Sequence, residues 1–191
     1  GDGVTQEGVE ECDDGNEDDS DGCTSNCEVD VRTVFITKGV YDGDLGGLTG
    51  ADSICQGLAV GSQIEGTFKA WLSTVQESAA DRLEHANVPY VLLDEESTHV
   101  AENWDDLVDG TILNSIALTE EGKPVGGTLA VWTGTKPDGS KAPMACVGWM
   151  SKMNGKNGTT GKRTSTGGTW TEDVTRECDS KSHIYCIEQV P

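Results

Sequence analysis

Six oxygen-bearing side chains near the start of the sequence could bind a hard metal ion. Carboxylate and amide oxygens are the ligands that Ca²⁺ prefers, whereas softer metals favour nitrogen and sulfur. The spacing differs from that of an EF-hand, because Asp19 stands where an EF-hand loop requires glycine. The alternative is a solvated acidic linker that charge repulsion extends. The candidate calcium ligands are Asp13, Asp14, Asn16, Asp18, Asp19 and Asp21.

Calcium would order an acidic segment that cannot fold by burying apolar side chains. Residues 1–30 hold 12 of the 34 acidic residues and no lysine or arginine, so disulfides or metal must supply their order. We expect a calcium titration to protect residues 13–21 against proteolysis and hydrogen exchange, because the ion neutralises the carboxylates, while residues 31–191 fold without it. Unchanged protection at millimolar calcium would instead support the linker interpretation.

A second candidate site combines one aromatic side chain with three carboxylates from distant parts of the sequence. Asp138 lies in the stretch 133–146, and Trp170, Glu172 and Asp173 follow it. An aromatic face can stack on a sugar, and carboxylates can bind hydroxyl groups, a cation or a basic side chain. Threonine and glycine precede Trp170, which predicts an exposed ring. The tryptophans in apolar, strand-like contexts are predicted to be core residues: Trp71, Trp132 and Trp149.

The acidic stretch 102–109 is a third candidate site, because it also surrounds an aromatic side chain with carboxylates. Asn103, Trp104 and Asp105 could together bind a sugar ring, its hydroxyl groups or a cation. The alternative is a tryptophan that anchors the core while its polar neighbours stay solvated, which is the commoner arrangement in a small domain.

Catalytic groups are sparse in this sequence. His85, His99 and His183 are far apart, and none has a nucleophile or a zinc-ligand spacing beside it. A remote alternative is a glycoside hydrolase that uses a carboxylate pair such as Asp105 and Asp173. The sequence therefore predicts a binding protein and no enzyme.

Composition and charge limit the cellular compartments and the binding partners that are possible for this protein. A net charge of −21 disfavours nucleic acid and anionic membrane surfaces, because both attract basic proteins. Seven cysteines without a Cys-x-x-Cys pair favour disulfides in an oxidising compartment. No apolar run approaches the roughly 18 residues of a membrane span, which predicts no direct membrane insertion. We expect a secreted or cell-surface protein whose partner is a glycan or an extracellular protein.

Strand and helix signals after residue 31 predict an α+β domain that positions these groups. The β-branched run Thr33–Thr37 predicts a strand. Thr49 with Asp52 predicts the N-cap of a helix that carries Cys55 on its inward face. Further expected elements are a strand over 68–73, a helix over 78–85, an extended run over 88–93, a turn at 137–139 and a flexible basic loop over 152–163.

The end of the sequence resembles a C-type lectin-like domain. Trp170–Asp173 precede Cys178, and Cys186 follows, much as a Trp-Asn-Asp motif precedes the third and fourth cysteines of that family. Four cysteines allow three pairings, and the resemblance implies that Cys55 pairs with Cys186 and Cys146 with Cys178. It also implies two helices, mostly antiparallel sheets, a long loop, and antiparallel pairing of the first strand with the last, which would span 184–189.

The same resemblance places the long loop at 133–146. Sugar-binding members carry Glu-Pro-Asn or Gln-Pro-Asp there, with Ca²⁺ bridging the side chains to the sugar. Here the tripeptide is Lys136-Pro137-Asp138, and its lysine would repel the ion. We expect Asp138 to lie close to Trp170, Glu172 and Asp173, and Trp170→Ala to weaken ligand binding with little loss of stability.

A closer resemblance links residues 33–189 to the leptospiral endostatin-like surface proteins. Its residues are KAWLS at 69–73, VAENWDDLVDGTI at 100–112, AVWTGT at 130–135 and YCIEQ at 185–189. The resemblance implies that this protein is an adhesin, since members of that family bind host matrix and complement proteins. The sequence thus predicts an extracellular, non-catalytic binding or adhesion module that recognises glycan or protein at the long-loop face, with a calcium-independent protein-binding adhesin as the alternative.

The first segment resembles the cysteine-rich repeat of secreted myxobacterial proteins. In that repeat a cysteine stands directly before Gly-Asp-Gly, and the later part reads ECDDGN, as residues 11–16 do here. Because the sequence begins at Gly1, the first cysteine of the repeat would be missing, which leaves one of Cys12, Cys23 and Cys27 without its usual mate. The resemblances divide the chain into a repeat at 1–30 and a lectin-like domain at 31–191.

Overall fold

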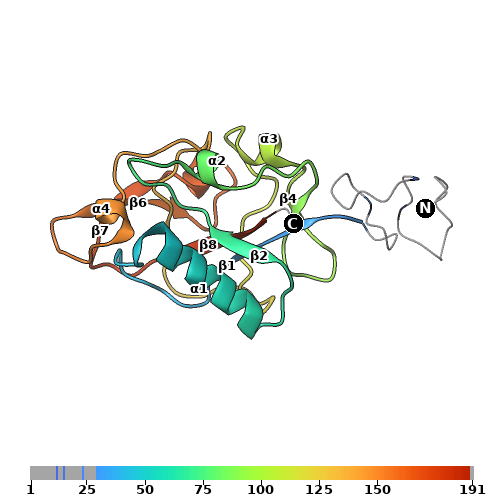
Figure 1. Cartoon of the computed structure of the whole chain (residues 1–191), viewed down its shortest axis with the longest axis horizontal. Helices are drawn as coiled ribbons and strands as arrows, with labels where there is room; N and C mark the ends of the chain where they lie inside the picture. Colours follow the sequence, from blue (N-terminus) through green and yellow to red (C-terminus); the bar gives the residue numbers. More distant parts are fainter. Residues whose placement is uncertain (1–11, 13–14, 16–22, 24–28, 190–191) are drawn as a thin grey trace.

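The first and last strands of the described chain pair at the centre of the fold. The computed structural model describes residues 12, 15, 23 and 29–189. Within them β1 (Arg32–Ile36) runs antiparallel to β8 (His183–Gln189), with Phe35 opposite Cys186. Figure 1 shows this pair in the middle of the molecule. The predicted strand and its antiparallel partner are therefore confirmed.

A mixed sheet extends from this central pair in both directions. The strand order is β4-β3-β1-β8-β5-β6-β7, and β2 pairs with β8 outside this path. β1 is parallel to β3 and β5 to β8, whereas the other pairs are antiparallel. The domain is therefore α+β with a mainly sheet core. The remaining strands are β2 (Thr67–Ala70), β3 (Tyr90–Val91), β4 (His99–Ala101), β5 (Ala130–Trp132), β6 (Asn157–Lys162) and β7 (Val174–Glu177).

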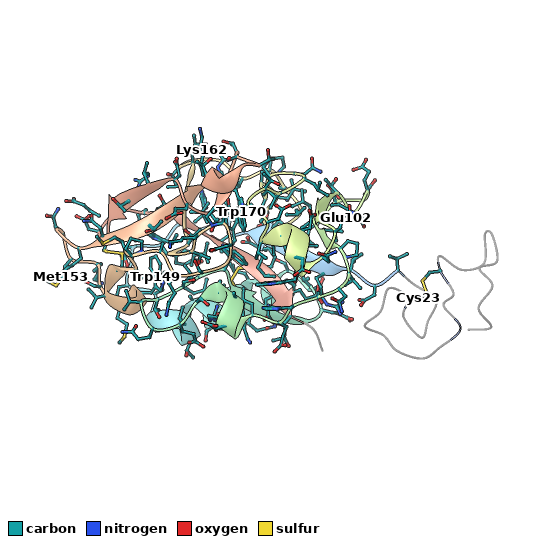
Figure 2. The ribbon with its side chains drawn as sticks, turned by 90° about the horizontal axis from the view of Figure 1, so that it is seen from above. Cys23, Glu102, Trp149, Met153, Lys162 and Trp170 are labelled. Carbon is teal, nitrogen blue, oxygen red and sulfur yellow. A yellow bond between two sulfur atoms is a disulfide. The ribbon has the colours of Figure 1, made fainter. Side chains whose placement is uncertain are left out.

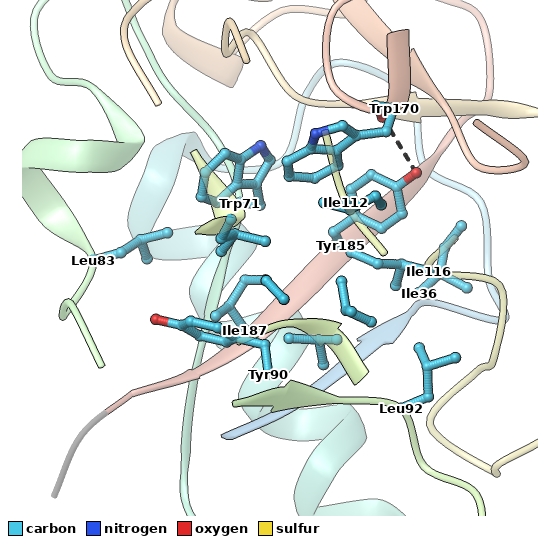
Figure 3. Close-up of a cluster of buried hydrophobic side chains, with 14 of the residues drawn as sticks. Ile36, Trp71, Leu83, Tyr90, Leu92, Ile112, Ile116, Trp170, Tyr185 and Ile187 are labelled. Atoms are coloured by element: carbon cyan, nitrogen blue, oxygen red, sulfur yellow. Dashed lines mark hydrogen bonds between the residues drawn. The ribbon is translucent and has the colours of Figure 1, made fainter. Parts of the chain in front are cut away.

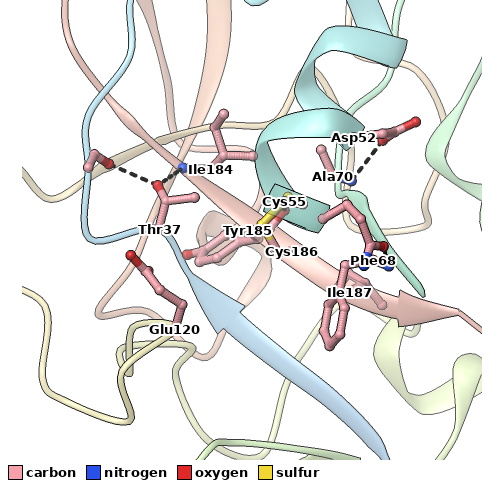
Figure 4. Close-up of a disulfide and its surroundings, with 12 residues drawn as sticks. Thr37, Asp52, Cys55, Phe68, Ala70, Glu120, Ile184, Tyr185, Cys186 and Ile187 are labelled. Carbon is pink, nitrogen blue, oxygen red and sulfur yellow. Dashed lines mark hydrogen bonds between the residues drawn. A yellow bond between two sulfur atoms is a disulfide. The ribbon is translucent and has the colours of Figure 1, made fainter. Parts of the chain in front are cut away.

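Alternation of side chains along β1 and β8 gives the sheet two buried faces. Val34 and Tyr185 face one hydrophobic core, whereas Phe35 and Cys186 face another. Figure 3 shows the first core, which includes Tyr185, and Figure 4 shows the second core around a disulfide of Cys186. The predicted core tryptophans are confirmed, because none of their side chains is exposed: Trp71, Trp132 and Trp149.

Helix α1 (Gly47–Gly61) covers the second core with small side chains. Their spacing of four residues places them on one face of a helix, and the cysteine among them reaches β8. The buried residues of this helix are Ala51, Cys55 and Ala59.

The start of α1 differs from the prediction. The helix begins after Gly46, whose φ of 78° glycine adopts readily, so the expected N-cap at Thr49 is wrong. Asp52, which was to complete that cap, accepts a hydrogen bond from the Ala70 main-chain N at 2.9 Å and forms an ion pair with Arg82. Asp52 thus contacts distant residues of the fold instead of the nearby main chain of its own helix.

The other helices are a single turn each. Helix α2 (Ala79–Arg82) begins with a capping box in which Ser78 Oγ accepts a hydrogen bond from the Asp81 N–H at 3.1 Å. The backbone of Leu83 is extended, so α2 ends before the predicted residue 85. The remaining turns are α3 (Trp104–Leu107), α4 (Cys146–Trp149) and the 3₁₀ turn η1 (Gly168–Trp170).

Three disulfides join described residues, which agrees with the predicted oxidising compartment. Two of them, Cys55–Cys186 and Cys146–Cys178, confirm the implied pairing, and the third joins Cys12 to Cys23. In the part of the chain that the structure describes, no helix is long and apolar enough to cross a membrane. The remaining cysteine and the predicted calcium ligands lie outside the described residues: Cys27, Asp13, Asp14, Asn16, Asp18, Asp19 and Asp21.

Candidate functional site

The long loop forms the predicted turn and packs against α2. Gly139 N donates to the Lys136 carbonyl at 3.0 Å, and the Ala80 N donates to the Gly139 carbonyl at 3.1 Å. Asp138 at the tip is exposed and accepts a hydrogen bond from Ser140 N at 3.0 Å. Hydrogen bonds from the Ser140 side chain and main chain lower the pKa of Asp138. Asp138 is therefore a charged group in solvent with local partners.

Trp170 is a core residue, which corrects the prediction of an exposed ring. Its side chain has no exposed surface, and its ring centroid lies 5.1 Å from that of Trp71 and 5.7 Å from that of Tyr185 (Figure 3). A Cβ built at Gly161 would lie 1.9 Å from the Trp170 carbonyl oxygen, so η1 rests directly on β6. The small residues before Trp170 therefore permit close packing, and the ring cannot stack on a ligand.

The base of the long loop does lie beside residues 170–173, as predicted. Trp71 Nε1 donates to Thr171 Oγ1 at 2.7 Å, and this hydroxyl donates to the Thr135 carbonyl at 3.1 Å. The carboxylates nevertheless have different surroundings. Glu172 is half-buried, whereas Asp173 is exposed and lines a hollow of about 190 Å³ together with two cationic side chains, Lys162 and Arg176.

The described residues do not bring the three predicted carboxylates together as a metal-ligand cluster. Among the described residues, no group of three histidine, cysteine, aspartate or glutamate side chains is close enough to hold a metal ion.

In the third candidate site, the core-anchor alternative is correct for the aromatic residue. The Trp104 ring is buried and stacks on that of His85, with centroids 4.0 Å apart. Asn103 Oδ1 accepts a hydrogen bond from the Asp106 N–H at 3.0 Å and caps α3. Asp105 is the exposed member of the three predicted residues. Asn103 and Trp104 thus have structural roles.

A left-handed helical turn, which was not predicted, lies at α4 between the long loop and β6. Cys146, Val147, Gly148 and Trp149 have φ values of 43°, 56°, 74° and 62°. Trp149 N donates to the Ala145 carbonyl at 2.7 Å, which closes the turn. Left-handed helix costs about 1–2 kcal/mol per residue that carries a Cβ. Other contacts must therefore hold these residues in place.

The two ends of the turn are anchored in the second core. Cys146 is bonded to Cys178, and Trp149 is buried with Nε1 donating to the Ser73 carbonyl at 2.8 Å. Two glycines allow the Trp149 ring to approach the backbone, since a Cβ at Gly134 or Gly158 would lie 2.8 or 3.1 Å from it. These anchors explain how strained residues persist.

The middle of the turn faces solvent and borders an apolar basin of about 410 Å³. Val147 is 63% exposed and lines this basin, and Met150 directly after the turn is 68% exposed. Figure 2 places Trp149 and Met153 toward one end of the domain and Glu102 toward the other. We define the turn surface as five residues. Val147 and Met150 come from the turn and the position directly after it, and Val75, Met144 and Lys156 line the basin together with Val147.

The methionines of the chain supply a sequence signal for this surface. The protein has three, and all lie within residues 144–153. Met144, Met150 and Met153 are 43%, 68% and 65% exposed. Methionine normally fills gaps in cores, and its concentration on surfaces is typical of adaptable binding sites. The clustering could have indicated the site, whereas the left-handed backbone could not.

The predicted flexible loop over 152–163 is only partly correct. Residues 157–162 form β6, which lies between β5 and β7 and is buried from Gly158 to Gly161. A Cβ at Gly158 would lie 2.8 Å from Cys146 Sγ, so this glycine is required by packing against the turn. Glycines in a sequence favour a loop, and the sequence alone does not show which neighbouring atoms require the absence of a side chain at Gly158.

A family comparison covers this part of the molecule. A family model with the description "Protein of unknown function (DUF1554)" matches residues 38–166. The matched range is about two thirds of the chain and includes α1, the long loop, α4 and β6. The turn surface thus lies within the family's own domain, and the chain belongs to the family of proteins of unknown function DUF1554.

Proposed function

We propose that the domain is an extracellular, non-catalytic binding module with a C-type-lectin-like fold, which binds a protein ligand through the turn surface without calcium. Two disulfides and the antiparallel pair of first and last strands support the lectin-like fold. The resemblance to endostatin-like adhesins favours the same class of ligand. A shared fold does not define the ligand, whereas the side chains and backbone of the turn do bear on it.

The observation that carries this proposal is the combination of strain and exposure at Val147. A β-branched residue in the left-handed region is a conformational outlier, and its strain costs about 1–2 kcal/mol. The side chain is 63% exposed, so little burial offsets that strain. Strain that is maintained without a packing benefit is typical of functional sites. The fixed turn presents an apolar side chain in one geometry, which reduces the entropy lost on binding.

The side chains of the turn surface favour a protein over a glycan. Sugar rings stack on exposed aromatic faces, but all five tryptophans of the chain are buried. Exposed methionine and valine side chains instead suit the varied apolar groups of a polypeptide. Glycan binding at the long loop is the second candidate, and exposed Asp138 and Asp173 favour it.

Val147→Gly is expected to raise the free energy of unfolding by about 1 kcal/mol, because glycine removes the Cβ that strains the turn. The melting temperature should rise by about 2–4 °C. Val60→Gly is the matched control, since Val60 is 66% exposed in α1. Glycine in that helix should lower stability by a few tenths of a kcal/mol. A loss of stability at position 147 would mean that the valine is not strained.

The binding function can be tested with a random dodecapeptide display library and a glycan array, both with and without EDTA. We expect peptides that bind the parent and Val60→Gly, lose affinity for Val147→Gly, and ignore EDTA. Thermal unfolding of each variant separates lost binding from lost folding. Glycan binding that survives Val147→Gly and disappears in EDTA would overturn the proposal in favour of the long loop.

A further inference from the structure

Positive charge is concentrated in one segment of this acidic protein. Residues 124–171 contain six bases and one acid, Asp138. The rest of the chain holds the other 33 acids and seven bases. The segment includes the long loop, α4 and β6, and it supplies every residue of the turn surface except Val75. The six bases are Lys136, Lys141, Lys152, Lys156, Lys162 and Arg163.

None of these six bases forms an ion pair with a carboxylate within the described residues. Lys156 lines the basin, and Lys141 Nζ donates to the carbonyl of Gln76, another lining residue, at 3.4 Å. Lys152 is exposed in the short segment between α4 and β6. Lys156 and Lys141 therefore lie at the apolar basin, and Lys152 is exposed four residues before Lys156.

We propose that the ligand of the turn surface is an acidic polypeptide segment that carries a large apolar side chain. The apolar side chain enters the basin beside Val147 and Met144, and flanking aspartates or glutamates pair with Lys141, Lys152 and Lys156. This inference rests on the proposed function and adds the chemical class of the partner. The lysines attract such an acidic segment toward the turn. Repulsion by the acidic remainder of the protein disfavours its binding elsewhere.

Other polyanions fit the same surface less well. A sulfated polysaccharide could pair with the lysines, but it has no apolar group for a basin of about 410 Å³. An anionic lipid surface would meet the acidic remainder of a protein with a net charge of −21, so repulsion would oppose the attraction of a few lysines. A peptide uses both the apolar and the basic parts of the surface.

The test uses the full chain and the library peptides that bind the parent but not Val147→Gly. We expect these peptides to be enriched in aspartate and glutamate beside leucine, methionine or aromatic residues. In fluorescence anisotropy, Lys152→Gln/Lys156→Gln should weaken a labelled acidic peptide about three- to tenfold. The matched control Lys38→Gln/Lys123→Gln removes two lysines that pair with Glu121 and should leave affinity unchanged. Higher salt should weaken binding to the parent.

The possible outcomes separate this inference from the proposed function. Turn-dependent peptides that are neutral or basic would overturn the inference, while the protein-binding function would stand. A library without turn-dependent peptides would overturn both. Heparin and phosphatidylserine vesicles are tested as alternative polyanions. If either binds tightly, and Lys152→Gln/Lys156→Gln abolishes this binding while Val147→Gly does not change it, the lysines bind that polyanion and the inference is overturned.

Discussion

Replacing Cys55 and Cys186 together with alanine is expected to lower the free energy of unfolding by roughly 5 kcal/mol. The bridge spans 131 positions and so removes much conformational freedom from the unfolded chain. Both cysteines are fully buried between α1 and β8, so alanine also leaves a small cavity in the second core (Figure 4). Urea unfolding of the parent and the double variant measures the difference.

The second bridge is the matched control for this experiment. Cys146–Cys178 spans 32 positions, and the same chain-entropy argument gives roughly 4 kcal/mol. Its removal should cost still less, because the left-handed turn can then relax. If removing Cys146–Cys178 lowered the free energy of unfolding as much as removing Cys55–Cys186, or more, the result would contradict a strained turn.

Trp170→Ala is expected to lower the free energy of unfolding by about 3–5 kcal/mol, because a buried ring between Trp71 and Tyr185 leaves a large cavity. Trp170→Phe should cost less, since it keeps most of the packing. The lost Nε1 also has no hydrogen-bond partner within the described part of the chain. Chemical unfolding and peptide binding at low temperature provide the two measurements.

A neighbouring residue provides the control for Trp170. Thr169 is exposed and its hydroxyl contacts only Ser165 among the described residues, so Thr169→Ala should change stability by no more than about 0.5 kcal/mol. Trp170→Ala should leave peptide affinity unchanged while the protein is folded. Lost binding with unchanged stability would instead return Trp170 to the ligand site that its sequence context predicted.

Sequence patterns predicted those elements in which local chemistry and tertiary structure agree. The β-branched run at β1 became a strand, and tryptophans in apolar contexts became core residues. The helix predicted from residue 78 does begin there, as α2, because its capping box needs only Ser78 and Asp81, three positions apart. The pairing of the cysteines, in contrast, followed from the family resemblance, because spacing alone leaves three pairings open.

The predictions failed where a distant contact decides the local structure. Trp170 stands in a polar, glycine-rich context, but Gly161 on β6 lets its backbone approach closely enough to bury the ring. The left-handed turn is the extreme case, since Cys146, Val147 and Trp149 all carry a Cβ and none favours positive φ. The disulfide and the Trp149 contact to Ser73 impose that conformation from outside the segment.

In the left-handed turn, the residues that fix the backbone differ from those that face solvent, and this separation has an evolutionary consequence. Cys146 and Trp149 hold the backbone from within the core, whereas Val147 and Met150 project away from it. Substitutions at the two exposed positions leave every anchoring contact in place, so they can alter what the surface recognises without endangering the fold. Such separation lets selection diversify partner choice one residue at a time, and it makes the turn a practical position for engineering new specificities into this domain.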